Sequence, residues 1–437
     1  MSELQFQDRN EIETYQCAQL RRLVATLLDG NPFYGEKLRH AGIDASISSL
    51  EHFTTSMPFT TKKELAADQA AHAPFGSNLS FPIERYTRLH QTSSTTGKPL
   101  RWLDTAESWE WMVDGWVTVL RAEGVTPRDR LFAAFSFGPF IGFWLGYEAA
   151  EKMGCMVIPG GSMNSVTRLK AILENEVTVL CCTPTYAIRL GQLARDKQVD
   201  LSQSKVRTII VGGEPGGSLP AIRARIESLW PGARVFDHHG MTECGPATHQ
   251  CPKQAGLLHL LEASLLCEFI HPETGEPMPE DSGEISELVI TTLGRTGSPL
   301  LRYRTGDLVR PGPNTKCRCG LWERVLEGGI IGRADDMIFV RGVNLYPSAV
   351  DELLSPISAI AEYRVEISED RSMTELCVYI EPMPDHPDPD SLKHEVAEVF
   401  RNSFNLRVPI KIVSPGSLPR FELKAKRWVR IESGKPL

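Results

Sequence analysis

The stretch from residue 90 to residue 99 reads His-Gln-Thr-Ser-Ser-Thr-Thr-Gly-Lys-Pro. Each residue from Thr92 to Thr96 carries a hydroxyl group, which offers one donor and two lone pairs. Gly97 lets the backbone approach a ligand closely, and Lys98 adds a positive charge. This composition is typical of a loop that wraps a polyphosphate, although the spacing is not that of a Walker loop. Taken alone, the stretch is explained equally well as a hydroxyl-rich surface turn, so its interpretation depends on the rest of the chain.

The segments around this loop predict an α/β fold. Residues 86–89 and 100–103 read as two strands that would place the loop at a hairpin tip. After residue 106, amphipathic helices alternate with short buried strands, which predicts a parallel sheet with ligands beyond the carboxyl ends of its strands. The expected helices span 109–122, 140–153, 166–174, 186–194 and 219–229, and the expected strands span 131–135, 155–159, 177–182, 206–211 and 234–237.

The remaining segments complete the predicted architecture. The first 60 or so residues read as helices, and a β meander with strands at 265–270, 285–292 and 307–310 follows the parallel sheet. We expect a large N-terminal domain, residues 1–333, with parallel and mixed sheets flanked by helices plus a β-rich subdomain. A small α+β C-terminal domain, residues 334–437, would follow it.

Composition excludes several classes of protein. The net charge of −8 over 437 residues argues against nucleic acid as the main partner. The most apolar stretch, residues 131–147, is at the short limit for a membrane span, and we interpret it as a buried strand, a loop and a helix. The first ten residues lack the pattern of a signal peptide. The ten cysteines do not have the regular spacing of a disulfide-bonded scaffold, which suits a protein of the reducing cytoplasm.

Six motifs occur in an order and at a spacing that carry a family resemblance. They are Thr92–Pro99, Gly240-Met-Thr-Glu243, Tyr303-Arg-Thr-Gly-Asp307, Gly332-Arg-Ala-Asp-Asp336, Arg341-Gly-Val-Asn-Leu-Tyr-Pro347 and Lys424-Ala-Lys-Arg427. With them the chain resembles the adenylate-forming superfamily of acyl-CoA synthetases, from about residue 30 to about residue 430. Within this superfamily the chain resembles the phenylacetate–CoA ligase branch. The resemblance lies in its short length, in the motif Arg-Tyr-Arg-Thr-Gly-Asp and in the segment Val-Asn-Leu-Tyr-Pro.

This resemblance implies a two-step reaction. A carboxylate attacks the α-phosphate of ATP, pyrophosphate leaves, and the acyl-adenylate then forms a thioester with coenzyme A and releases AMP. Negative charge builds up on phosphate oxygens, so the protein must supply donors, a cation and a metal ion. The resemblance implies three catalytic residues: Lys424 bridging carboxylate and α-phosphate, Glu243 holding magnesium, and Thr242 donating to the α-phosphate.

The resemblance also implies a nucleotide site and a mobile C-terminal domain. Asp307 would accept the ribose hydroxyls, and Arg333 would reach the ribose or a phosphate. Asp335 would be the hinge about which the C-terminal domain rotates between two poses, and Arg341 and Gly342 would line the CoA entry in the second pose. The other expected ATP-binding residues are Thr92, Ser93, Ser94, Thr95, Thr96, Gly97, Lys98, Gly213, Glu214, Pro215, Asp237, His238, His239, Gly240 and Met241.

Each motif also has a purely structural interpretation. Thr242 and Glu243 could be a helix N-cap with a first-turn acid. The stretch 213–215 could be a tight turn, Asp307 a turn aspartate, and the basic run around Lys424 a solvated face that includes Lys426.

Three positions depart from the family pattern. Ser94 replaces a loop glycine, His239 replaces a tyrosine, and Leu423 replaces the glycine before the expected catalytic lysine. The third change leaves Lys426 as an alternative to Lys424, although the spacing to Arg427 favours Lys424.

A group of cysteines and histidines predicts a metal site. Cys317 and Cys319 are one residue apart, and two such thiolates need further partners to complete a tetrahedral site. Cys251 and His259 lie where a neighbouring strand could bring them close, and some ligases of this branch carry such a set. We expect structural zinc on these four residues, with His249 as the substitute ligand. The alternative is free cysteines in a loop.

The expected acyl slot lies in the loops after the central strands. Its candidate residues are Phe137, Phe140, Ile141, Gly212, His238 and His239. Phenylalanines and glycines make a flat apolar slot, which favours an aromatic acid such as phenylacetate, benzoate or an aminobenzoate. The alternative for the phenylalanines is simple core packing.

Three functions remain open from the sequence. The first is an aryl–CoA ligase, and the second is an adenylating enzyme that passes its acyl group to a carrier protein or an amine. The third is a non-catalytic nucleotide-binding protein, against which the combination of Glu243, Asp307 and Lys424 argues. The expected partners are the acid, ATP and CoA, with no nucleic acid and no membrane, and relatives imply a homodimer.

Overall fold

The computed structural model describes residues 6–92, 99–279, 281–341, 343–370, 373–384, 386–421 and 424–431. Four helices open the chain: α1 (Arg9–Gly30), α2 (Pro32–His40), α3 (Leu50–Ser56) and α4 (Lys62–Ala71). Helix α4 begins at a capping box, because Thr61 and Glu64 each accept from the other's backbone amide. The apolar sides of α1 to α3 pack on Leu266 and Leu301 of the β meander.

The predicted hairpin is confirmed. Strands β1 (Tyr86–Gln91) and β2 (Arg101–Thr105) pair antiparallel, with Gln91 opposite Arg101. The hydroxyl-rich residues 93–98 between them lie outside the described residues.

A parallel sheet of five strands forms the centre of the N-terminal part. Its order is β4-β3-β5-β6-β7. Alternate residues face opposite sides: Leu131 packs with α5 and α6, whereas Phe132 packs with α8 and α9. The elements are α5 (Ala106–Ala122), β3 (Arg130–Ala133), α6 (Trp144–Lys152), β4 (Met156–Pro159), α7 (Ser165–Glu174), β5 (Val179–Cys182), α8 (Pro184–Asp196), β6 (Thr208–Val211), α9 (Pro220–Leu229) and β7 (Arg234–Asp237).

Helix α6 is shorter than expected. The sequence predicts a helix from residue 140, but α6 begins at Trp144. Gly142 has a φ of +42°, which a right-handed helix cannot accommodate. Residues 136–143 are therefore a loop at the carboxyl end of β3.

The β meander is a six-stranded antiparallel sheet in the order β10-β11-β15-β14-β13-β12. The strands β10, β11 and β15 were not predicted from the sequence. In β15, Gly328 and Gly329 have positive φ values. They interrupt the alternation of apolar and polar residues by which a strand is recognised in a sequence. The elements are β8 (Gly240–Met241), β9 (Gly245–Pro246), β10 (Thr248–Cys251), β11 (Gln254–Leu260), β12 (Leu265–Ile270), β13 (Ser286–Thr292), β14 (Tyr303–Pro311) and β15 (Val325–Arg333).

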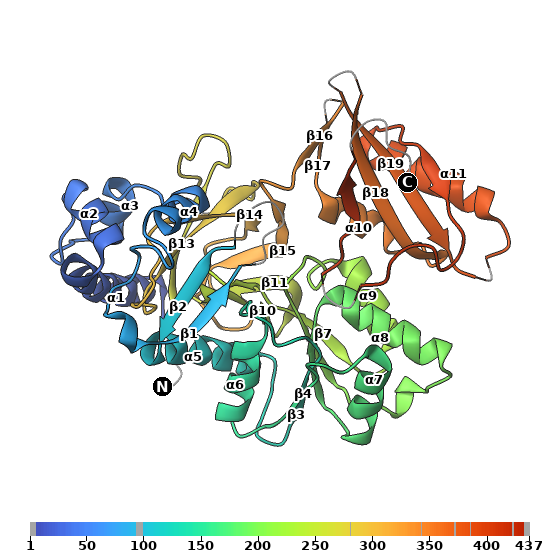
Figure 1. The fold of residues 1–437 in the computed structure, drawn as a ribbon, viewed down its shortest axis with the longest axis horizontal. Coiled ribbons are helices and arrows are strands. Elements are labelled where there is room, and N and C mark those ends of the chain that lie inside the picture. Colours follow the sequence, from blue (N-terminus) through green and yellow to red (C-terminus); the bar gives the residue numbers. More distant parts are fainter. Residues whose placement is uncertain are drawn as a thin grey trace.

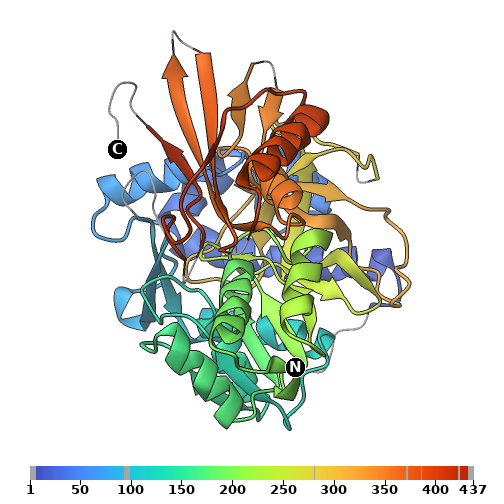
Figure 2. The ribbon, with the colours of Figure 1, turned by 90° about the vertical axis from the view of Figure 1, so that its right-hand side faces the viewer.

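The C-terminal unit, defined as β16 to β21, has its own core. A sheet of order β20-β19-β18-β21 packs against α10 and α11, and α10 also contacts α9 and β15. Figures 1 and 2 show this unit lying over α8 and α9. The elements are β16 (Ile338–Val340), β17 (Val343–Leu345), α10 (Pro347–Leu354), β18 (Ile360–Asp370), β19 (Met373–Pro382), α11 (Pro389–Phe404), β20 (Ile410–Ile412) and β21 (Trp428–Arg430). Among the described residues, no helix has both the length and the apolarity needed to cross a bilayer.

Candidate active site

The hairpin that carries the hydroxyl-rich loop lies against the loop that follows β3. The backbone amide of Gln91 donates to the carbonyl of Pro139 at 2.7 Å. Thr92 closes the base of the hairpin: its amide donates to the Leu100 carbonyl at 2.9 Å, and its hydroxyl accepts from the Leu100 amide at 3.1 Å. The expected phosphate loop thus starts beside Phe137 and Phe140, two expected acyl-binding residues.

The expected nucleotide residues gather at the carboxyl end of β7, where an open parallel sheet places its ligands. Asp307 is buried, with Arg333 Nη1 3.0 Å from its Oδ1 and His239 Nε2 3.1 Å from its Oδ2. Burial opposes ionisation of Asp307, but these two neighbours outweigh it and lower its pKa. The result is an ionised carboxylate that can accept from hydroxyl groups. Arg333 also binds Asp335, the expected hinge residue, at 2.9 Å.

Asp237 is the last residue of β7. Its Oδ2 accepts from the Ser218 hydroxyl at 2.5 Å. A Cβ on Gly217 would lie 2.5 Å from its Oδ1, and one on Gly329 would lie 3.1 Å from its Oδ2. Both glycines are therefore needed for this packing, and the described contacts of Asp237 hold the strand end together.

Thr242 and Glu243 follow the short strand β8. The Glu243 side chain is buried, and burial raises its pKa. A buried carboxylate is costly without a cation, and a carboxylate oxygen is the ligand that magnesium prefers. The donor chemistry at Glu243 therefore fits the expected magnesium ion.

A buried ion pair that the sequence analysis missed supports these two residues. Arg295 and Asp104 have fully buried side chains and form two hydrogen bonds of 2.7 Å. Arg295 Nη1 also donates to the carbonyls of Thr242 and Glu243, at 2.8 and 2.7 Å. The pair thus ties the end of the hairpin strand β2 to the expected magnesium residue.

Lys424 approaches the site from the C-terminal unit. A Cβ on Gly213 would lie 3.5 Å from its Cε. Lys424 keeps solvent exposure, yet desolvation around its ammonium group lowers its pKa, while the charges of Glu214, Glu243 and Asp307 oppose this. Lys424 therefore lies near Glu243, which is expected to hold magnesium, and near Asp307, which is expected to bind the ribose.

Glu214 links the two parts of the chain through backbone amides. Its Oε1 accepts from the Thr185 amide at the start of α8, and its Oε2 accepts from the Ala425 amide, both at 2.9 Å. Ala425 follows Lys424 directly, so this carboxylate holds the lysine-bearing segment against the N-terminal part. From the sequence, Glu214 was expected only to bind ATP.

The structure does not bring all expected site residues together. Arg341 lies at the turn between β16 and β17, where its guanidinium binds Glu375 of the same unit. Gly342 lies outside the described residues.

Aromatic rings cluster next to the loop after β3. The ring of Phe135 lies 4.8 Å from that of Phe137 and 5.0 Å from that of Phe143. Trp116 of α5 contacts both Phe143, at 5.7 Å, and His238, at 4.2 Å between ring centroids. Trp116 and Phe143 were missed from the sequence, where they read as helix residues. Phe135 and Ile141 are buried in the core beneath the loop, and Phe140 folds over Gly138 and Gly142 of its own loop.

The expected metal ligands come together. One ligand atom from each of Cys251, His259, Cys317 and Cys319 lies within 4.8 Å of the others. Cys251 Sγ is 3.7 Å from Cys317 Sγ, and Cys319 Sγ is 3.3 Å from His259 Nε2. Such separations suit a tetrahedral ion with bonds of about 2.0–2.3 Å. His259 Nδ1 faces the Glu323 carbonyl at 3.3 Å, which leaves Nε2 for a metal. His249 stacks on His259 but is not part of the cluster.

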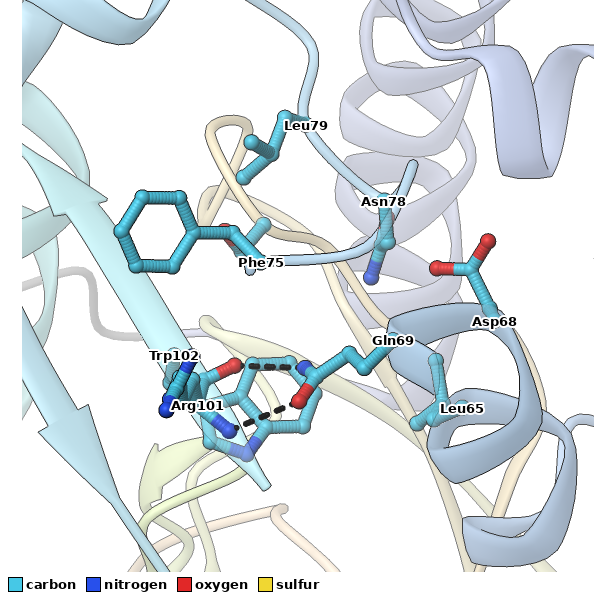
Figure 3. A pocket seen from close by; sticks show the side chains of 9 residues that line it. Leu65, Asp68, Gln69, Phe75, Asn78, Leu79, Arg101 and Trp102 are labelled. Carbon is cyan, nitrogen blue, oxygen red and sulfur yellow. Dashed lines mark hydrogen bonds between the residues drawn. The ribbon is translucent and has the colours of Figure 1, made fainter. Parts of the chain in front are cut away.

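A separate small pocket lies between α4 and β2 (Figure 3). Gln69 exchanges two hydrogen bonds with the backbone of Arg101, at 2.7 and 3.0 Å. Asp68 accepts from the amide and the hydroxyl of Ser77 at 2.7 and 2.5 Å. These polar groups bind one another, and none of the expected site residues lines the pocket.

Comparison with known proteins agrees with this arrangement. Residues 87–292 match the family model described as AMP-binding enzyme, and residues 342–430 match the model described as AMP-binding enzyme C-terminal domain. The chain is therefore an adenylate-forming enzyme, an AMP-forming acid–CoA ligase.

Whole-chain relatives identify the branch. The chain is 31% identical to phenylacetate–coenzyme A ligase of Thermus thermophilus over 96% of each protein. It is 28% identical to the phenylacetate–coenzyme A ligase of Escherichia coli, over 96% of this chain and 94% of that one. The chain belongs to the phenylacetate–CoA ligase family, whose ATP-dependent chemistry forms an acyl-adenylate and then a CoA thioester.

One solved relative matches in more than one state. The crystal structure of 2-hydroxyisobutyryl-CoA ligase in the postadenylation state with 2-HIB-AMP has a TM-score of 0.91 at 26% identity and covers 98% of this chain and 91% of that chain. The same enzyme with 2-HIB-AMP and CoA in the thioesterification state has a TM-score of 0.73 at 27% identity, with the same coverage. The pose of this chain is thus closer to the postadenylation state.

Proposed function

We propose that this enzyme activates an aromatic carboxylic acid and transfers it to coenzyme A. The observation that carries the substrate class is the aromatic cluster of Phe137, Phe143 and Trp116, which Phe135 joins together and which reaches His238 at the end of β7. Aromatic rings pack favourably edge to face at such separations, so an aromatic acid would be favoured next to this cluster. Relatives named phenylacetate–coenzyme A ligase, at about 30% identity, support this class.

In the first half-reaction, an oxygen of the carboxylate attacks the α-phosphorus of ATP and pyrophosphate leaves. Lys424 neutralises charge on the carboxylate and the α-phosphate, and Asp307 with Arg333 orients the ribose. Thr242 donates to the α-phosphate. Glu243 would hold a magnesium ion, which would supply positive charge to the phosphate oxygens. In the second half-reaction, the thiol sulfur of CoA attacks the acyl carbonyl carbon, the thiol proton goes to solvent, and AMP leaves.

We propose that residues 334–437 rotate about Asp335 between the two half-reactions. The higher TM-score with the postadenylation state supports a pose for adenylation in this structure. Arg341 lies away from the nucleotide residues in this pose, and rotation would bring its turn to the CoA entry. A homodimer and a cytoplasmic location stay predictions.

The cluster of Cys251, His259, Cys317 and Cys319 would hold a structural zinc ion. The support is the convergence of one histidine nitrogen and three sulfurs, a ligand set typical of closed zinc sites. Zinc would join β10 and β11 to the loop before β15.

The deciding experiment measures AMP formation from ATP with magnesium and a panel of aromatic acids, with and without CoA. Lys424→Ala should abolish the activity, whereas Lys426→Ala, a matched change two residues away, should retain most of it. AMP formation that does not require CoA would favour a carrier protein or an amine as acceptor. Activity only with short aliphatic acids would contradict the aromatic proposal.

A further inference from the structure

His238 occupies a decisive position in the expected acyl slot. It follows β7 directly, its amide donates to the Val211 carbonyl at 2.9 Å, and only 6% of the residue is exposed. Its Nδ1 lies 2.8 Å from the Thr248 carbonyl oxygen. A carbonyl can only accept, so Nδ1 must carry the proton.

The ring is held in its neutral form. It is buried against the face of Trp116, with 4.2 Å between ring centroids. Burial lowers the pKa of His238 to about 3, and the neighbouring His239 and His249 add to this effect. A neutral imidazole with its proton on Nδ1 has a lone pair on Nε2, which is then an acceptor only.

Nothing in the described part of the chain donates to this acceptor. Among the described residues, the hydrogen bonds of the His238 ring involve Nδ1 alone. A Cβ on Gly240 would lie 3.1 Å from Nε2, so glycine at this position keeps the nitrogen uncovered. A ligand that covers this acceptor without donating to it would leave the acceptor unpaired, which is unfavourable, and a donor on the ligand would avoid this cost.

We infer that the acid activated by this enzyme carries a hydrogen-bond donor, a hydroxyl or an amino group, that binds to Nε2 of His238. This inference rests on the proposed function, because it places His238 in the acyl slot. It narrows the substrate class from aromatic acids in general to hydroxy- or amino-substituted acids. An acid that covers Nε2 without donating to it leaves this acceptor unpaired, so the site rejects the analogue that lacks the donor.

Matched pairs of acids test the inference. ATP–pyrophosphate exchange is measured with benzoate and its hydroxy and amino derivatives, with phenylacetate and its hydroxy derivatives, and with isobutyrate and 2-hydroxyisobutyrate. The wild-type enzyme should prefer a donor-bearing acid by about tenfold or more in kcat/KM, the effect of about 1.4 kcal/mol. The corresponding methoxy acid, which is larger but cannot donate, should lose this preference.

Two variants separate the hydrogen bond from pocket shape. His238→Leu should reduce the preference, measured as the ratio of kcat/KM within each pair of acids, to about twofold or less, whatever its effect on the absolute rates. Phe143→Leu, on the other side of Trp116, should lower the rates with both members of a pair by the same factor. A preference that survives in His238→Leu, or equal rates for both members of every pair in the wild type, would overturn the inference.

A second readout does not depend on turnover. Nitrogen-15 NMR of histidine-labelled enzyme, assigned with His238→Leu, should show a protonated Nδ1 and an unprotonated Nε2 that shifts when the preferred acid binds. A protonated Nε2 would refute the argument. If only the aliphatic pair is active and shows the donor preference, the aromatic proposal fails and the role of His238 stands.

Discussion

Replacing Glu214 by glutamine should slow adenylation and leave thioester formation intact. In the structure the Glu214 carboxylate accepts hydrogen bonds from the backbone amides of Thr185 and Ala425, each at 2.9 Å. Glutamine has the same shape but only one acceptor oxygen and no charge. It can therefore accept from one of these amides while its NH₂ group faces the other.

The expected magnitude follows from one lost contact. A hydrogen bond to a charged group contributes about 1.5–3 kcal/mol, and partial exposure of Glu214 favours the lower end. Lys424 would also lose an attractive charge nearby. A cost of about 1.5 kcal/mol to the adenylation pose corresponds to a rate about tenfold lower.

The two half-reactions are measured separately. ATP–pyrophosphate exchange reports adenylation, and transfer from supplied acyl-adenylate to CoA reports thioester formation. Glu214→Gln should lower the first about tenfold and leave the second within about twofold. Glu227→Gln is the matched control, since Glu227 accepts from the Val235 amide at 3.1 Å within the N-terminal part. Equal losses in both half-reactions, or no loss in either, would refute the reasoning.

Three further predictions concern stability, metal content and pH. Asp104→Asn leaves the buried Arg295 without its counter-charge and should lower the free energy of unfolding by about 3–5 kcal/mol in urea titrations; a change below 1 kcal/mol would contradict the role assigned to the pair. Cys319→Ser should reduce the zinc content measured by elemental analysis, whereas Cys377→Ser should not, and zinc-free wild-type protein would disprove the site. The pKa of Asp307 is lowered by folding, so its ionisation stabilises the protein above the ordinary aspartate pKa, and this contribution is lost as the pH falls through the lowered value. The difference in unfolding free energy between wild type and Asp307→Asn should therefore shrink below about pH 4, and a constant difference would exclude the effect.

Local patterns in the sequence predicted much of the fold. The alternation of helices and strands gave the parallel sheet, because each element is recognised within a few residues. The hairpin of β1 and β2 depends on near neighbours and was predicted in the same way. The convergence of Cys251 and His259 with Cys317 and Cys319 was also expected, since the chemistry of thiolates requires partners.

Contacts between distant residues could not be predicted. Asp104 and Arg295 are 191 positions apart, and Glu214 and Ala425 are 211 apart. Neither pair has a local signature, because the two partners of each pair are far apart in the sequence. The tautomer of His238 depends on a carbonyl of β10, a strand that sequence patterns did not reveal.

The pairing of Asp104 with Arg295 has a consequence for synthesis of the protein. A growing chain that ends before Arg295 already contains the hairpin, the parallel sheet and the segment with Thr242 and Glu243. It lacks the guanidinium that neutralises Asp104 and holds the carbonyls of that segment. The active-site segment can therefore reach its final form only after about two-thirds of the protein has left the ribosome, which makes early nucleotide capture by a nascent chain unfavourable.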